Sequence, residues 1–82
     1  MVNRGAELEF DAELDALGLI CPLPVLKLRK RLEKMVQGEV IQVTADDPAA
    51  VVDIPHFCHE QGHKILKSDI SQQSCVFFIK KC

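Results

Sequence analysis

The sequence predicts an α/β fold, a two-layer sandwich of order βαβαββ in which both helices cover one face of a four-stranded mixed sheet. Three observations predict this class. An early segment alternates between acidic and apolar residues, two segments carry apolar residues at helical spacing, and two short apolar segments near the end flank a polar turn. With 82 residues, the chain is expected to form a single domain over 1–82, because so short a chain cannot bury two cores. We expect residues 1–6 to be disordered.

The first strand is predicted from the alternation over 7–16, where acids occupy one face and apolar side chains the other. Burying the acidic face would leave unpaired carboxylates away from water, at a cost of several kcal/mol each. The acidic face must therefore meet water. We expect the sheet to be covered on one side only.

The first helix is expected to begin at Pro22, because a proline at the first helical position has no amide hydrogen to lose. Its apolar residues recur at helical spacing: Val25, Leu28, Leu32 and Met35. Gly38 is expected to stop the helix, and the apolar run at 39–45 predicts a second strand. A strand, a helix and a strand in this order predict a right-handed parallel crossover.

The second helix is expected to use Asp47 as its N-cap and Pro48 as its first residue, and to end at Gly62. Pro55 lies inside this segment and removes one backbone hydrogen bond, so a kink or a new helix start is expected near Asp53. The remaining residues give two short strands around the polar turn 71–74, which predicts a hairpin.

The composition places limits on the class of protein. Apolar residues make up 48% of the chain and charged residues 27%, and no run approaches the ~20 apolar residues of a membrane span. No targeting segment is visible, so we expect a cytoplasmic protein with its four cysteines reduced. The net charge of −2 argues against generic nucleic-acid binding, and without Trp or Tyr no stacking on bases is expected.

Cys21 is the strongest candidate for chemistry, because it follows the first strand and stands directly before the first helix. Pro22 and Pro24 stiffen the opening turn. The helix dipole contributes about 0.3 to 1 kcal/mol, less than one pKa unit, unless the amides of Leu23 or Val25 also bond the sulfur. We therefore expect an exposed, moderately activated thiol. In the alternative interpretation, Cys21 is a small apolar residue in a rigid turn.

Two segments, LDALGLICPLPVLKLRK at 14–30 and ADDPAAVVDIPHFCHEQGH at 45–63, resemble the TusA/SirA-like sulfur carrier proteins, from about residue 10 onward. The resemblance implies the βαβαββ sandwich and assigns Cys21 of the CPxP motif as a persulfide carrier. The sulfur would come from a cysteine desulfurase or a rhodanese-type donor and pass to a partner protein. Members that serve tRNA thiolation often have a charged residue between the two prolines, where this chain has Leu23. The pathway, whether tRNA thiolation, cofactor biosynthesis or sulfur metabolism, therefore stays open.

The other cysteines and the histidines are given structural or incidental roles. Cys58 and Cys75 fall on apolar faces and are expected in the core, while Cys82 is expected to be mobile and reactive. Neither Cys-x-x-Cys nor Cys-x-Cys occurs, which argues against a thiol oxidoreductase and suits a carrier. The group His56, Cys58, His59 and His63 does not converge on one helical face, so we expect no metal and no cofactor.

A basic face on the first helix is the candidate partner-binding surface. It consists of Lys27, Lys30, Arg31 and Lys34. Such a face could steer an acidic partner or a tRNA toward Cys21, or it could simply be solvated. It also supports an alternative function, a non-catalytic regulatory module that binds RNA or protein through this helix.

Overall fold

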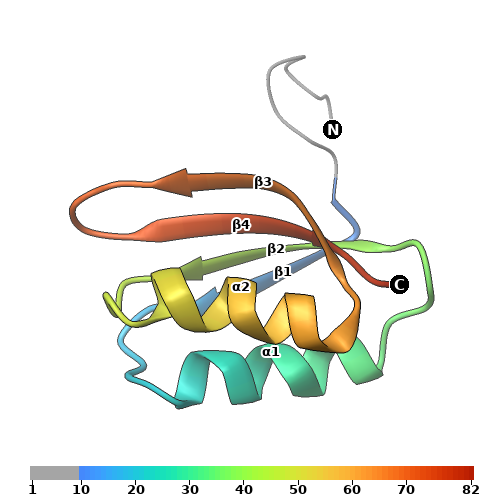
Figure 1. Cartoon of the computed structure of the whole chain (residues 1–82), viewed down its shortest axis with the longest axis horizontal. Helices are drawn as coiled ribbons and strands as arrows, with labels where there is room; N and C mark the ends of the chain where they lie inside the picture. The colour runs from blue at the N-terminus through green and yellow to red at the C-terminus, as the bar shows by residue number, and fades with distance from the viewer. Residues whose placement is uncertain (1–9) are drawn as a thin grey trace.

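The computed structural model describes residues 10–82, and these form a four-stranded sheet with two helices. The elements are β1 (Ala12–Ala16), α1 (Leu23–Glu33), β2 (Val40–Ala45), α2 (Ala50–Gln61), β3 (Lys64–Ile70) and β4 (Cys75–Lys80). Both helices lie on the same side of the sheet (Figure 1). The predicted fold class is confirmed. The expected disorder of residues 1–6 and the expected strand residues 7–9 lie outside the described part of the chain.

The sheet has the order β1-β2-β4-β3, with β1 and β2 parallel and the other neighbours antiparallel. In the centre, Val43 lies between Leu14 of β1 and Phe77 of β4. Because β1 and β2 are parallel, their carboxyl ends lie at one edge of the molecule, where the amino-terminal ends of α1 and α2 also lie (Figure 1). This edge of the fold carries the CPxP segment.

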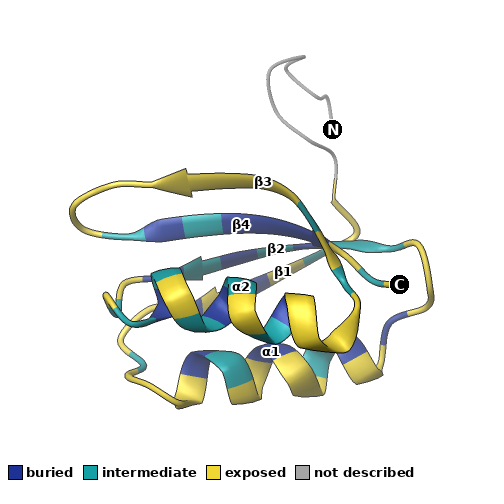
Figure 2. Cartoon of the chain, in the orientation of Figure 1, coloured by how far each residue is buried: buried dark blue, intermediate teal, exposed yellow. Residues whose placement is uncertain are grey.

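The core lies between the sheet and the helices, and the buried residues follow the predicted periodicities (Figure 2). The most completely buried large side chains come from α1, α2, β2 and β4, and include Leu28, Ile41, Ile54, Phe77 and Ile79. On the opposite face of the sheet, Phe78 packs near Phe10 with ring centroids 6.0 Å apart. Glu13 and Asp15 of β1 are exposed while Leu14 and Ala16 are buried, as the alternation predicted.

Both helices begin later than the sequence predicted. α1 begins at Leu23, with Pro22 at the N-cap position, because the Leu23 amide donates to the Ile20 carbonyl at 2.8 Å and closes a turn before the helix. α2 begins at Ala50 rather than at Pro48. Asp47 is not its N-cap, because the N-cap position is held by Ala49; the Asp47 oxygens accept hydrogen bonds from the Cys21 amide and the Ala49 amide.

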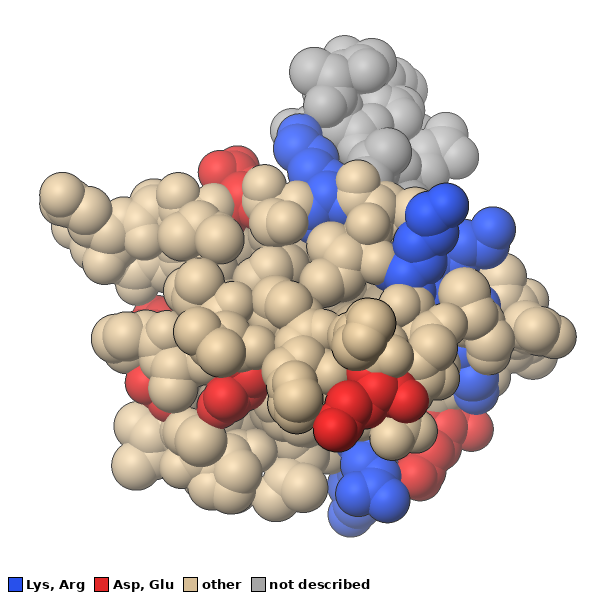
Figure 3. All heavy atoms as spheres, viewed as in Figure 1, with Lys and Arg blue, Asp and Glu red and all other residues tan. Residues whose placement is uncertain are grey.

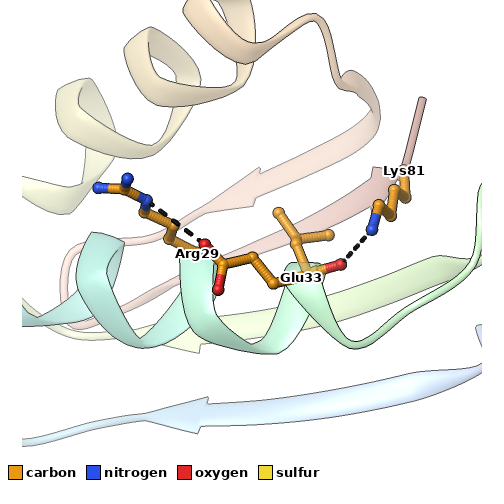
Figure 4. Close-up of polar contacts among 4 residues, drawn as sticks. Arg29, Glu33 and Lys81 are labelled. Atoms are coloured by element: carbon orange, nitrogen blue, oxygen red, sulfur yellow. Dashed lines mark hydrogen bonds and ion pairs between the residues drawn. The ribbon is translucent and has the colours of Figure 1, made fainter.

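The helix ends agree with the prediction in one case and not in the other. Gly62, with φ of 80°, ends α2 as predicted, whereas α1 ends at Glu33 with Lys34 as its C-cap, four residues before Gly38. Of the two alternatives predicted near Asp53, the new helix start is wrong, because α2 continues through Pro55 as one helix, and the kink stays a prediction. At the end of α1, the Lys81 Nζ donates to the Leu32 and Met35 carbonyls at 2.6 and 2.7 Å. Figure 4 shows the first of these bonds beside the Arg29–Glu33 ion pair.

Candidate functional site

The Cys21 thiol lies on the connection between β1 and α1, and it is exposed. Every residue from 17 to 22 is exposed apart from Leu19, which is partly buried against the core. The connection therefore projects from the edge where the carboxyl ends of β1 and β2 meet. The predicted exposure of the sulfur is confirmed.

Two consecutive aspartates at the end of β2 bond the connection that carries Cys21. Asp46 Oδ1 accepts a hydrogen bond from the Gly18 amide at 2.9 Å, and Asp47 Oδ2 accepts one from the Cys21 amide at 2.6 Å. The second oxygen of Asp47, Oδ1, accepts from the Ala49 amide at 3.2 Å. Sequence reasoning missed this arrangement, although the parallel pairing of the two strands could have indicated that residues following each would meet.

Carboxylates also affect the pKa of the Cys21 thiol. A hydrogen bond with the side chain of Asp53 raises the pKa of this thiol, and desolvation and the negative charges of Asp53 and Asp47 raise it further. The expectation of a thiol activated by the helix tip is therefore wrong. The Leu23 amide, one of the two donors considered for the sulfur, is bonded to the Ile20 carbonyl, and Pro22 and Pro24 have no amide hydrogen.

The other cysteines lie where the sequence predicted, and all four are free thiols. Cys58 and Cys75 are each 1% exposed, in the core between the helices and the sheet. Burial raises the pKa of Cys58 to about 11 and also raises that of Cys75. Cys82 is exposed, and its thiol lies 3.6 Å from the Lys80 carbonyl. Exposed sulfur in the described chain is therefore confined to Cys21 and Cys82.

The predicted basic face of α1 is divided into two pairs by the structure. Lys27 Nζ donates to the Asp15 carbonyl at 2.8 Å and Arg31 donates to the Glu13 carbonyl at 3.3 Å, so these two side chains bond the backbone of the edge strand β1. Lys30 and Lys34 are exposed. The four residues stay a predicted partner-binding surface, with the side chains of Lys27 and Arg31 bonded to β1.

An apolar hollow that the sequence reasoning missed lies along α1 beside the Cys21 connection. It has a volume of about 550 Å³ and is lined by Leu19, Leu23, Leu26, Lys27, Arg29, Lys30 and Glu33. Leu23 and Leu26 are 45% and 46% exposed, and Ile20 next to the cysteine is 68% exposed. The signal was visible in the sequence as two leucines one helical turn apart on the face opposite the core stripe.

The electrostatic character of the site differs from that of the basic helix face. On the face drawn in Figure 3, the left end of the molecule, where the amino-terminal ends of both helices lie, shows acidic atoms and no basic ones. Near Cys21, Asp47 and Asp53 contribute negative charge that acts on the thiol. An incoming reactant would therefore meet negative charge near the sulfur.

The histidines make local contacts, and the two helices are short. Within residues 10–82, no group of three or more His, Cys, Asp or Glu side chains is arranged to hold a metal ion. His56 pairs with Glu60 at 3.3 Å, and His63 Nδ1 accepts a hydrogen bond from the Cys82 amide at 3.1 Å. The two helices of the described chain are too short or too polar to span a membrane.

The fold and the sequence both resemble those of known proteins. The crystal structure of a SirA-like protein from Desulfitobacterium hafniense has the same fold, with a TM-score of 0.73 and 24% sequence identity over 85% of this chain and 96% of that one. The family model described as sulfurtransferase TusA matches residues 12–81. The match includes the CPLP segment, the two aspartates that bond its loop, and every strand and helix described above. The chain therefore belongs to the TusA family and has a general role in sulfur transfer.

Proposed function

We propose that Cys21 carries sulfur as a persulfide, accepting a sulfane sulfur from a donor protein and passing it to an acceptor protein. The observation that carries this proposal is the exposed Cys21 thiol on a connection that projects from the edge of the fold. Cys58 and Cys75 are buried and so are poorly placed to attack a persulfide on Cys21. Cys21 is followed directly by Pro22 at the N-cap and by Leu23, Pro24 and Val25 in the first turn of α1, and the two prolines restrict the backbone there.

The proposed transfer is a thiol–persulfide exchange with no net oxidation. The Cys21 sulfur attacks the outer sulfur of a donor persulfide, a new S–S bond forms on Cys21, and the S–S bond of the donor breaks. The donor sulfur leaves as a thiolate and takes up the proton that Cys21 loses. Cys21 thus becomes a persulfide while the donor becomes a thiol, and the reverse exchange delivers the sulfur to the acceptor.

The raised pKa of Cys21 supports a division of labour between the carrier and its partners. The attacking species is the thiolate, and the hydrogen bond to Asp53 together with nearby negative charge favours the neutral thiol. The free carrier is therefore a poor nucleophile at neutral pH. We expect the donor to supply a group that helps to remove the proton when the two proteins meet.

We propose that the apolar hollow on α1 is part of the docking surface for these partners. Leu23 and Leu26 offer apolar area beside the sulfur, and Lys30 borders the same hollow. Lys34 lies about one turn further along the helix. A cysteine desulfurase or rhodanese-type donor with an apolar and acidic loop would match this combination.

Mass spectrometry tests the carrier function. Incubation with a cysteine desulfurase and cysteine should add one sulfur atom to the protein, and the Cys21→Ala variant should gain none. Cys82→Ser is the matched control, because it removes the other exposed thiol and should leave the gain unchanged. If Cys21→Ala gains sulfur as readily as the parent protein, the assignment to Cys21 is wrong.

A second candidate function is a regulatory module that binds RNA or protein without covalent chemistry. The observation that favours it is the exposure of Lys30 and Lys34 on one helix. In that case Cys21→Ser would keep full activity, and reversing the charge of Lys30 would abolish binding.

For the carrier we propose a cytoplasmic location, where thiols stay reduced. Transfer of labelled sulfur to tRNA, to a cofactor precursor or to a sulfur-metabolising enzyme would identify the pathway.

A further inference from the structure

We propose that Asp47 is the residue that positions Cys21 for sulfur transfer, and that it acts through the backbone amide of Cys21. The inference rests on the proposed carrier function and adds a positioning residue to it. It starts from the hydrogen bond of 2.6 Å between the Cys21 amide and Asp47 Oδ2, which joins residues 26 positions apart in the sequence.

The connection that carries Cys21 is held mainly by polar bonds, because burial fixes little of it. From residue 17 to 22, Leu19 is the residue packed against the core, and the others are exposed. Asp46 holds this connection at Gly18 and Asp47 holds it at Cys21. Loss of the second bond would leave the segment next to the sulfur without its tie to the end of β2.

Asp47 is itself fixed, so it can transmit the position of β2 and α2 to the thiol. Its Oδ1 accepts from the Ala49 amide at 3.2 Å while its Oδ2 accepts from the Cys21 amide, so each oxygen is used by a different segment. On the other side of Cys21, the ring of Pro22 restricts the backbone. The Cα atom of Cys21 is therefore constrained from both directions.

Fixed placement matters because exchange between two sulfur atoms needs the attacking atom in line with the bond that breaks. Misplacement of a reacting atom by about 1 Å can slow a reaction by about a hundredfold. The carrier must present its sulfur to a donor and then to an acceptor, and each holds its own reacting sulfur in a separate site. A thiol on an untied loop would reach this alignment rarely.

The hydrogen bond of Asp47 should favour sulfur transfer, but its negative charge should lower the intrinsic reactivity of the Cys21 sulfur. Its negative charge contributes to the raised pKa of the Cys21 thiol, after the larger contributions of Asp53. Removing Asp47 should therefore make the thiol no less reactive toward a small reagent, while protein-to-protein transfer becomes slower. A residue that served the reactivity of the thiol would change both rates in the same direction.

Two rates test whether Asp47 has these two opposite effects. Both are measured in the full chain with Cys82→Ser as background. In Asp47→Ala, we expect sulfur transfer from a cysteine desulfurase at saturating donor to fall at least tenfold, with little change in the half-saturating donor concentration. The rate of iodoacetamide reaction at Cys21, at pH 7, should not fall. Glu60→Gln removes a charge from α2 about two turns beyond Asp53 and should behave as the parent protein in both assays.

The amide proton of Cys21 reports on the hydrogen bond directly. In the parent protein we expect this proton to be shifted downfield and protected from exchange, and in Asp47→Ala we expect both features to be lost. If transfer slows while the amide signal is unchanged, Asp47 acts on the donor and the proposal is wrong. If the amide signal changes while transfer keeps its rate, the hydrogen bond has no positioning role and the proposal is equally wrong.

Asp47→Asn guards against simple unfolding, because the amide side chain keeps one acceptor oxygen. It should retain the fold and give an intermediate transfer rate. A folded Asp47→Asn with the parent rate and no Cys21 amide bond would overturn the inference. Failure of the carrier function itself is recognised separately, since the parent protein would then gain no sulfur at Cys21 from the desulfurase.

Discussion

At the scale of the residue, the surroundings of Cys21 predict how its reactivity depends on pH. The hydrogen bond and charge of Asp53 raise the pKa of the Cys21 thiol, so less thiolate is present at neutral pH. In Asp53→Asn both effects weaken and the pKa falls toward its ordinary value. Reaction with iodoacetamide should become severalfold faster at pH 7, and its pH profile should move to lower pH. The measurement uses the Cys82→Ser background, where Cys21 is the exposed thiol.

Glu60→Gln is the control for this experiment, because it removes a carboxylate from the same helix but leaves Asp53 in place. Its pH profile should match that of the parent protein. An Asp53→Asn profile that stays at the parent position, or moves to higher pH, would show that Asp53 does not restrain the thiol.

The residue scale also shows which features of the candidate site could be predicted from the sequence and which could not. The exposure of Cys21 and the burial of Cys58 followed from local pattern and were confirmed. The three aspartates near Cys21 could not be assigned in this way, because their positions depend on β1 and β2 pairing side by side and on the turn of α2 that faces the connection. Asp47 was predicted as an N-cap, a role for which its residue type is well suited, yet its oxygens are used by two other amides.

At the scale of the element, the end of α1 depends on Lys81 from beyond β4. Its Nζ donates to the Leu32 and Met35 carbonyls at the point where the helix is ending, and the Leu32 carbonyl also accepts the Met35 amide at 3.0 Å. We expect Lys81→Met to lower the free energy of unfolding by about 1 to 3 kcal/mol, since two part-buried hydrogen bonds from a charged group are lost. Urea unfolding measures the change. Lys80→Met, at the exposed neighbouring position, should stay within about 0.5 kcal/mol of the parent protein.

The elements themselves were predictable because each has a strong period or a clear boundary residue. The alternation in β1, the core stripe of α1 and the polar turn before β4 all correspond to described elements. The errors lie at helix starts, where a turn precedes the first helical residue in both cases. Such turns use backbone hydrogen bonds, which leave little trace in the residue pattern.

At the scale of the whole molecule, the Cys21 sulfur lies near negative charge, whereas the exposed Lys30 and Lys34 provide positive charge along α1. Carboxylates surround Cys21, while Lys30 and Lys34 stand along α1 beside the apolar hollow. A partner that docks on α1 would therefore be attracted by the helix and meet a protonated thiol at its tip. Under the proposed function, we therefore expect sulfur transfer to begin only after the partner has docked on α1.

The basic residues of α1 should accordingly separate into two functional pairs. Lys30→Ala and Lys34→Ala should slow sulfur transfer severalfold at low salt and leave stability within about 0.5 kcal/mol, because they are exposed. Lys27→Ala and Arg31→Ala remove hydrogen bonds to the edge strand β1 and should lower stability by about 0.5 to 1.5 kcal/mol. Transfer rates at low and high salt and urea unfolding of all four variants provide the test.

The slower transfer of Lys30→Ala and Lys34→Ala should disappear at about 0.5 M salt, where charges more than a few ångströms apart are screened. A loss that persists at high salt, or equal losses of stability in both pairs, would contradict this division.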